Sequence, residues 1–172
     1  MAKRAFHANN WTPTATADTS TLSSATYMGI QGGSSTQLVN ILEILINGQA
    51  TTSAPTMLQL ARDSTVCAST GLGVLAAPNS CGPMHPSTAA LAAPTSPNVA
   101  VATAPQRSAV TTYGRLELGL NAFGGIMKWN PYTPDMAFSI LGNTASLGEC
   151  SLSSYTGGSV GNVSAHIIFE PL

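Results

Sequence analysis

The clearest hydrophobic pattern in this chain lies at residues 38–46, which read LVNILEILI. With a helical period, the apolar residues recur at intervals of three and four, as on one face of an amphipathic helix. With a strand period, the same run is short, rich in Ile, and closed by the turn residues Asn47 and Gly48. A second apolar run, centred on Met57–Ala61, follows a polar loop over about 47–55. Periodicity alone therefore leaves both a helix and a long β-hairpin open.

The polar residues decide between these two interpretations. Only 8% of the 172 residues are charged, against about 25% in a typical soluble domain, and Ser and Thr occupy the polar positions instead. An exposed helix needs a charged face, and this chain has too few charges to supply several of them. Thr favours strands and Ser favours turns. We therefore predict two strands joined by a loop here, within an all-β fold. A 44% hydrophobic composition argues against disorder.

The remainder of the chain fits an all-β prediction. No internal repeat is present, and strands do not alternate with helical segments, so we predict a single β-sandwich domain over 1–172. About eight strands separated by Gly, Pro, Ser and Asn indicate a sandwich or a jelly roll, whose double-sheet closure manages its open edges. Beyond the hairpin, the strands are expected near 26–31, within 108–120, at 123–130, within 146–154 and at 163–169.

Two segments lack a strand pattern. The first is an N-terminal arm over 1–24. The second spans 68–109, where Ala, Pro, Ser, Thr and Gly dominate. Proline cannot donate a ladder hydrogen bond, so no central strand fits this stretch, and we predict a long loop with a functional role. Six of the eleven prolines lie in it, namely Pro78, Pro83, Pro86, Pro94, Pro97 and Pro105.

Charge and cysteine content restrict the partners. The net charge is −1 and the six basic residues are scattered, so no stripe could neutralise many phosphates of a nucleic acid. No apolar run approaches the roughly 18 residues of a membrane span, and no signal-peptide hydrophobic run is present. Three cysteines argue against a secreted disulfide framework. We therefore expect a soluble protein made in a cytoplasm, without direct contacts to nucleic acid or membrane.

The search for catalytic chemistry yields no motif. A hydrolase needs a nucleophile beside an oriented base. One Gly-x-Ser-x-Gly match occurs, at 157–161, but it is interpreted as a turn without the strand-to-helix context of a nucleophile elbow. His166 lies within the apolar strand pattern VSAHIIF. Cys81 and His85 do not have the paired spacing of a zinc site. Tyr and Trp residues could form a sugar-binding platform, although core and interface packing is the commoner use. We expect a protein that is not an enzyme and has neither cofactor nor metal.

Glu43 interrupts the apolar run of the first hairpin strand. Under strict alternation it shares a face with Val39, Ile41 and Leu45, which is a costly position for an unpaired carboxylate. Either Arg62 or an arginine of a neighbouring subunit pairs with it, or it lies exposed at a sheet edge. A strand that is apolar on both faces is expected to have the core on one side and a subunit partner on the other.

The succession of these segments resembles small structural proteins of tailed bacteriophages. VNILEILINGQATTSAPTMLQLARDSTV, IMKWNPY, LGECSLSS and SAHIIFEPL carry the resemblance, over roughly 39–66 and 123–171. The pattern is similar to jelly-roll cement, or decoration, proteins of the outer capsid surface. This resemblance implies a non-enzymatic virion protein that binds and stabilises the shell of the major capsid protein. It also implies assembly in the host cytoplasm and a homo-oligomer, often a trimer.

Proteins of this kind bind through a rigid sandwich with extended arms and loops. The alternative function is a phage tail or fibre component, or a carbohydrate-binding β-sandwich that recognises a host surface. Such a protein would carry exposed aromatics together with Asp or Asn at one loop end. A shell-forming protein is a third hypothesis. For the decoration protein, the candidate interface residues on the arm, the hairpin and the loop are Lys3, Arg4, Phe6, Trp11, Glu43, Arg62, Pro83, Pro94, Pro97 and Arg107.

Overall fold

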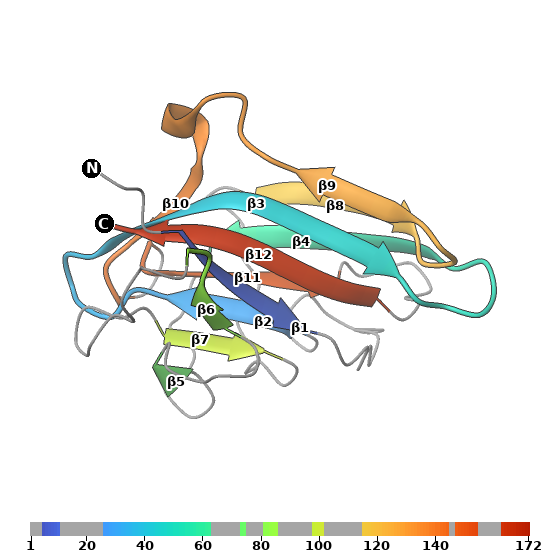
Figure 1. Cartoon of the computed structure of the whole chain (residues 1–172), viewed down its shortest axis with the longest axis horizontal. Coiled ribbons are helices and arrows are strands. Elements are labelled where there is room, and N and C mark those ends of the chain that lie inside the picture. The colour runs from blue at the N-terminus through green and yellow to red at the C-terminus, as the bar shows by residue number, and fades with distance from the viewer. Residues whose placement is uncertain are drawn as a thin grey trace.

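The protein folds as a sandwich of two antiparallel β-sheets around one hydrophobic core (Figure 1). The computed structural model describes residues 5–10, 26–62, 73–74, 81–85, 98–101, 115–144, 147–154 and 163–172. The helical structure in these residues is a single 3-10 turn, η1 (Pro134–Met136). The prediction of an all-β fold, and of strands for the run at 38–46, is therefore confirmed.

Sheet A has the strand order β10-β3-β12-β1-β6, and β9 also pairs with β3. Because β12 occupies one edge of β3 along nearly its whole length, β9 and β10 share the other edge. The strands of sheet A are β1 (Phe6–Asn10), β3 (Leu38–Gly48), β6 (Cys81–Pro83), β9 (Ile126–Trp129), β10 (Phe138–Leu141) and β12 (Val163–Pro171).

Sheet B has the strand order β5-β7-β2-β11-β4-β8. Its long strands occupy the centre, and the two-residue strand β5 closes one end. The strands of sheet B are β2 (Thr26–Gln31), β4 (Pro55–Arg62), β5 (Gly73–Val74), β7 (Asn98–Val101), β8 (Arg115–Asn121) and β11 (Glu149–Ser154).

The pairing partners nest inside one another along the chain. β1 pairs with β12, β2 with β11, β3 with both β9 and β10, and β4 with β8. If β9 and β10 are taken as two halves of one strand, these eight strands pair first with last, second with seventh, third with sixth and fourth with fifth. This is the connectivity of a jelly roll, in which one long hairpin is folded over into two sheets. The jelly-roll prediction is confirmed.

The core lies between the two sheets and is built from alternate residues of the long strands. Phe6 and Phe169 stack there with ring centroids 6.1 Å apart, which joins the first strand of the jelly roll to the last. Each fully buried side chain of this size stabilises the fold by about 1.5–3 kcal/mol. The largest fully buried side chains are Phe6, Met28, Ile30, Ile41, Ile44, Ile46, Leu58, Leu60, Ile140, Leu152, Ile167 and Phe169.

Strands occur in both segments that lacked a strand pattern. Phe6–Asn10, within the expected arm, is β1 and lies between β12 and β6. Within 68–109 lie β5, β6 and β7, so the prediction of a plain loop is wrong for these residues. Proline does not prevent this, because Pro83 ends the edge strand β6 and β7 has none. Apart from Ala5, Met84 and His85, the remaining residues of 1–24 and 68–109 lie outside the described part of the chain.

A β-bulge interrupts β3 at Leu42. The register places Ile168 opposite Glu43 and the next residue, Phe169, opposite Ile41. Leu42 is therefore the extra residue, and a bulge of this kind shifts the alternation of the bulged strand by one. On the other edge of β3, the pairing with β10 ends at Ile41 and the pairing with β9 begins only at residue 44. The bulge lies where the partner strand divides.

The bulge reverses the side on which Glu43 lies. The buried residues of β3 are Val39 and Ile41 before the bulge and Ile44 and Ile46 after it. Glu43 consequently points away from the core, and the prediction that it shares a face with Val39 and Ile41 is wrong. The same irregular spacing explains why the run also matched a helical period.

At one end of the sandwich, the β3–β4 loop and the β8–β9 turn form one tip. The side-chain Oδ1 of Asn121 accepts hydrogen bonds from the backbone N–H groups of Ala54 and Phe123, both at 3.0 Å. Its Nδ2 donates to the hydroxyl of Ser53 at 2.9 Å. Gly124 has a φ of 69°, in the left-handed region that favours glycine. Asn121 therefore holds both loops, and with them Phe123, in one geometry.

Deleting Leu42 should destabilise the protein less than deleting Leu45. Without Leu42, the strand alternates regularly and the four buried residues of β3 keep their inward positions. Without Leu45, Ile46 turns outward and Asn47 turns into the core, which adds a loss of about 2–5 kcal/mol, the usual cost of removing a large buried aliphatic side chain. Urea unfolding of both deletion variants measures the difference. Equal losses of stability in the two variants would show that the bulge does not determine which side chains of β3 point into the core.

Candidate interaction face

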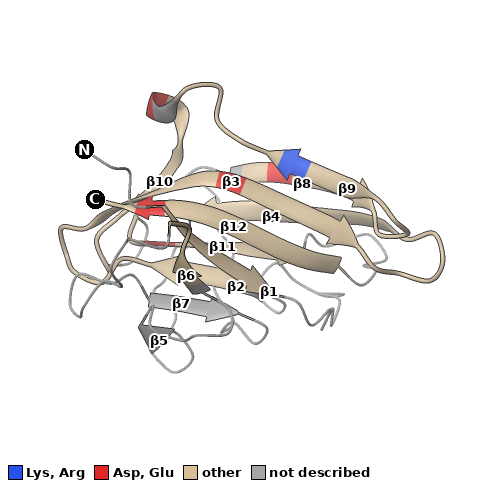
Figure 2. Ribbon diagram, in the orientation of Figure 1, with Lys and Arg blue, Asp and Glu red and all other residues tan. Residues whose placement is uncertain are grey.

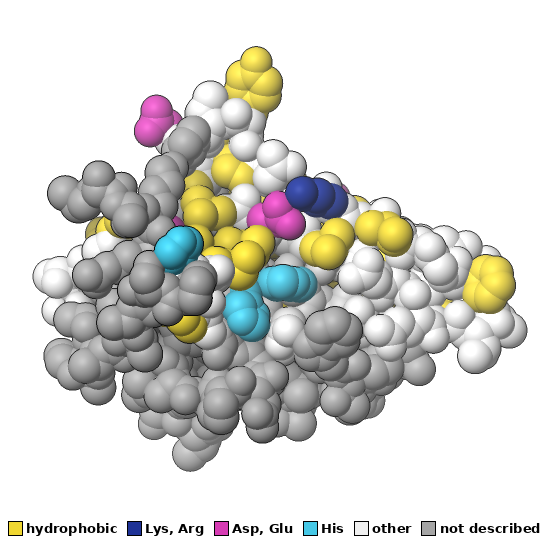
Figure 3. Space-filling view, in the orientation of Figure 1, with side chains coloured by type: hydrophobic (Ala, Val, Ile, Leu, Met, Phe, Trp, Pro, Cys, Tyr) yellow, Lys and Arg dark blue, Asp and Glu magenta, His cyan; other side chains and the backbone are white. Residues whose placement is uncertain are grey.

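The outer side of sheet A presents a mixed polar and apolar surface, which Figure 3 shows from the front. The side chains of this surface point away from the core, because along each strand they alternate with the buried residues. In β3 this alternation is shifted by one residue after the bulge. Hydrophobic side chains surround a small polar centre. We call this surface the sheet A face, and it consists of His7, Glu43, Leu45, Lys128, His166 and Ile168.

The outer side of sheet B has a different character. Along β4 and β11, the residues that alternate with the inward-facing leucines are Gln59, Ala61, Ser151 and Ser153, and none of them is more than 2% exposed. The outer side of these strands is therefore buried over 59–61 and 151–153, although Met57 at the start of β4 is exposed, whereas the sheet A face is partly or fully exposed along β3, β9 and β12. Of the two outer sides, the sheet A face is the one whose central strands are open to a partner.

An ion pair lies near the centre of the sheet A face. The Nζ of Lys128 lies 2.9 Å from Oε2 of Glu43, with the two side chains 55% and 28% exposed. Water screens a pair of this kind, so it contributes at most about 1 kcal/mol to folding. Figure 2 shows how few other charged positions the described ribbon carries. Glu43 therefore satisfies its carboxylate with Lys128, and the predicted pairing with Arg62 is wrong.

Arg62 has a different role, which links the two sheets. Its Nε donates a 2.7 Å hydrogen bond to the backbone carbonyl of Ser139 in β10. Its guanidinium carbon lies 4.8 Å from the ring centroid of Phe138, within the range of a cation–π interaction. Arg62 comes from β4 in sheet B, so these contacts join β4 to an edge strand of sheet A.

Two histidines lie side by side on the sheet A face. The rings of His7 and His166 meet edge to face, with centroids 5.5 Å apart. His7 lies opposite Ile168 and His166 opposite Asn9, so the imidazoles are diagonal neighbours on β1 and β12. Nδ1 of His7 and Nε2 of His166 are buried without a hydrogen-bond partner. Each ring therefore carries one nitrogen that has lost water and gained no bond.

The surroundings of His166 disfavour its charged form. Burial lowers the pKa of His166 below its ordinary value of 6.5, the neighbouring His7 lowers the pKa further, and Glu43 raises it in part. The imidazole of His166 is therefore neutral at pH 7. The ion pair of Glu43 and Lys128 is then the charged centre of the sheet A face.

This arrangement is suited to binding. Within the described ranges, no group of three or more His, Cys, Asp and Glu side chains could hold a metal ion. Leu45 and Ile168 contribute apolar area beside the ion pair, and the imidazoles contribute nitrogens that could bond to a partner. Apolar contacts of this kind supply affinity, and the few polar groups fix the orientation of the partner.

Of the predicted interface residues that the structure describes, Glu43 alone belongs to the sheet A face. Phe6 is 1% exposed and packs in the core, so its side chain is not available to a partner, whereas Pro83 is exposed at the end of β6. The pattern at 163–169 could have indicated His166 and Ile168, which alternate with buried residues. Lys3, Arg4, Trp11, Pro94, Pro97 and Arg107 lie outside the described residues.

Comparison with known proteins adds no relative. No protein-family model, curated protein or solved structure matches this chain. In the described part of the chain, no helix is both long enough and apolar enough to cross a membrane. Arguments about function therefore depend on the geometry of this chain's own residues.

We expect the stability of the protein to fall as the pH drops below about 6.5. The folded-state pKa of His166 is lowered, so the unfolded chain binds more protons in that range. The stabilisation from the neutral imidazole is complete above the unfolded pKa and is lost as the pH falls through the lowered pKa. Urea unfolding between pH 7.5 and pH 5.5 measures this loss.

His166→Gln should flatten that pH dependence, whereas the matched control His85→Gln should leave it unchanged, because His85 is exposed and lies outside the pair. If His166→Gln and the unmodified protein lose stability in parallel between these pH values, His166 does not cause the effect.

Proposed function

We propose that this protein is a non-enzymatic structural component of a virus particle, a decoration or cement protein that binds and stabilises the shell of the major capsid protein. The observation that carries the proposal is the sheet A face. It is a broad strand surface with partly exposed Leu45 and Ile168 around one ion pair. Broad, weakly charged surfaces suit docking between proteins, since the cores of protein interfaces are depleted of charge.

The fold supports this proposal without deciding it. Jelly rolls are frequent in viral capsid proteins, and they also occur in lectin domains and cupins. A fold therefore does not fix a function, and the argument must come from the surface. The resemblance of the sequence to capsid decoration proteins points in the same direction as the sheet A face, and the two are independent observations.

The energetics of the sheet A face suit attachment to a preformed shell. Of the strands that carry it, β1, β3 and β12 are paired on both sides over most of their length, so their backbone loses little freedom on docking.

One observation favours the alternative of a carbohydrate-binding protein. Tyr132 is 92% exposed and shares its loop with Asn130 and Asp135, so one loop carries an aromatic ring, an amide and a carboxylate. A sugar could stack on this ring. A glycan screen of the isolated protein and of Tyr132→Ser separates this alternative from the decoration role, which predicts no glycan binding that depends on Tyr132.

Leu45→Lys should weaken binding to the capsid shell at least tenfold, a loss of about 1.4 kcal/mol or more. The lysine would place an unpaired charge at the centre of the docked surface, close to Lys128. Stripped virus particles of the type that carries this protein are incubated with purified protein, and the bound fraction is measured by sedimentation.

Met57→Lys is the matched control, because Met57 is exposed on the outer side of sheet B. Both variants should unfold at nearly the same urea concentration as the unmodified protein. Unchanged binding of Leu45→Lys, or an equal loss with Met57→Lys, would contradict the assignment of the sheet A face. Failure of the unmodified protein to bind particles would contradict the proposed function itself.

A further inference from the structure

Exposed hydrophobic side chains are concentrated at one edge of the sandwich. Of the five most exposed large hydrophobic residues in the described ranges, four lie along this edge: Tyr132 at 92%, Ile126 at 72%, Met136 at 65% and Phe123 at 59%. They belong to β9, to the turn before it and to the segment after it. A concentration of this kind is unusual on a monomer and marks an interaction site.

An apolar seam connects the two ends of this edge. Leu116 and Leu120 of β8 and Met127 and Trp129 of β9 are only partly buried against the core. β8 is the last strand of sheet B, and β9 lies at the edge of sheet A. Neither has a further strand beside it among the described residues. Open edges with an apolar seam between them favour pairing with another chain.

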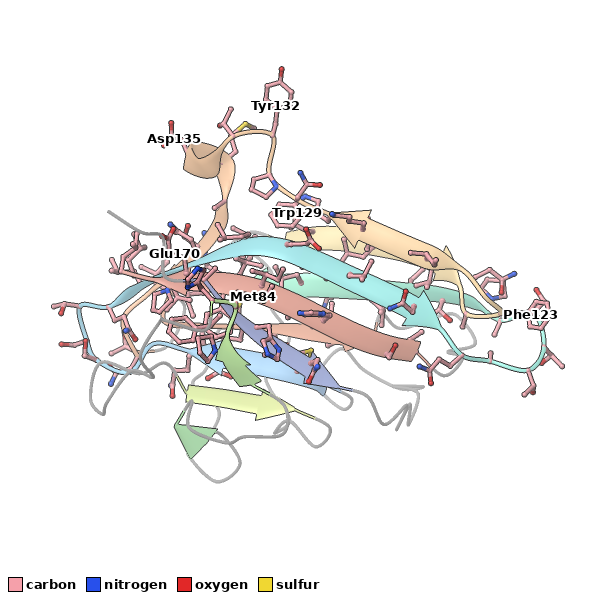
Figure 4. All side chains as sticks on the ribbon, viewed as in Figure 1. Met84, Phe123, Trp129, Tyr132, Asp135 and Glu170 are labelled. Carbon is pink, nitrogen blue, oxygen red and sulfur yellow. The ribbon has the colours of Figure 1, made fainter. Side chains whose placement is uncertain are left out.

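Both ends of the edge hold their hydrophobic side chains in fixed positions. Figure 4 shows that the segment 130–137 carries Tyr132 away from the sandwich, while Phe123 lies at the opposite end. In this segment the backbone N–H of Met136 donates to the carbonyl of Thr133 at 3.0 Å, and two prolines restrict the backbone further. At the other end, the hydrogen bonds of Asn121 fix Phe123. Docking on these ends therefore costs little conformational entropy.

We propose that this edge binds a second copy of the chain. The β8–β9 edge, as we call it, consists of β8, the turn 122–125, β9 and the segment 130–137. The two copies are related by a twofold axis that is normal to the sheets and passes through the seam. This axis reverses the direction of the edge, so the projecting segment of each copy lies against the tip of the other. Tyr132 then meets the partner's Phe123 and the partner's Ile126.

Self-complementarity is the reason to choose a second copy as the occupant. A twofold contact requires that one surface fit itself, and an edge that is apolar at both ends and along its middle meets this condition. No charged residue lies in the seam. Glu117, Lys128 and Asp135 of the edge flank it, and Lys128 already pairs with Glu43. This geometry gives a dimer, in contrast to the trimer that the sequence resemblance implies.

The proposal does not depend on the proposed function. The sheet A face and the β8–β9 edge point in different directions, so a dimer could form with or without a capsid shell. Self-association is measured on purified protein alone, whereas the decoration role requires particles. Either proposal can therefore fail while the other holds.

Disulfide trapping with variants that carry one introduced cysteine tests the twofold geometry. In a background of Cys67→Ser and Cys81→Ser, with the buried Cys150 left in place, the variants Ile126→Cys and Tyr132→Cys are oxidised separately and as a mixture. The expected result is a covalent dimer that forms at least tenfold more in the mixture than with either variant alone. Equal or greater cross-linking of either variant with itself would overturn this arrangement.

Sedimentation velocity supplies a second, non-covalent measurement. The unmodified protein should sediment as a dimer, and Ile126→Ser with Tyr132→Ser should raise the dissociation constant at least tenfold at unchanged thermal stability. The control Leu172→Ser, exposed at the C-terminus away from the edge, should leave the constant unchanged. A monomer at every concentration, a trimer, or a double variant that dimerises as well as the unmodified protein would overturn the proposal.

Discussion

The antiparallel pairing of β12 with β3 is the constraint on which the rest of the structure depends. It runs from Val163 opposite Gly48 to Pro171 opposite Val39 and places the last strand of the chain between β1 and β3. Sheet A is therefore complete only when the C-terminal strand β12 is present. The residues of β12 are more than a hundred positions away in sequence from the residues of β3 that they contact. Contacts of this kind make folding slow, since the chain must close long loops before they form.

The same pairing determines which side chains enter the core and which form the sheet A face. Along β12, Ile167 and Phe169 point inward, so His166 and Ile168 point outward. The bulge in β3 then brings Glu43 to the outer side, where Lys128 of β9 reaches it. Without the extra residue Leu42, the carboxylate of Glu43 would be buried and unpaired. With it, the carboxylate lies on the outer side in an ion pair with Lys128.

The sequence was sufficient for the fold class and for the two strands β3 and β4, but the prediction that they form a hairpin is wrong, because β3 lies in sheet A and β4 in sheet B. Nor was the sequence sufficient for the details that build the site. Few charges and many hydroxyls indicated strands because exposed helices need charged faces, and the turn residues marked the strand ends. The bulge was not predictable, since it depends on the register with a strand more than a hundred residues away. That Lys128 is the partner of Glu43 follows only from the register of β9 with β3. β1 and β7 are short strands that pair with longer neighbours, and neither has enough residues to show a pattern of its own.

The structure separates two surfaces that serve different kinds of contact. The sheet A face is central and partly polar, with one ion pair beside apolar side chains, which suits a specific foreign surface. The β8–β9 edge has an apolar seam and, in the proposed dimer, matches itself under a twofold rotation, which suits a second copy. A dimer built on the edge would present two sheet A faces on the same side, and such bivalent display raises the apparent affinity for a repetitive shell well above that of one copy.

Electron cryomicroscopy of virus particles that carry this protein tests the central claim most directly, because it shows which surface of the sandwich meets the shell. We predict density of the major capsid protein in van der Waals contact with Leu45 and Ile168, within about 4.5 Å of their side chains. A reconstruction in which the sheet A face points to solvent, while another surface of the protein contacts the shell, would contradict it.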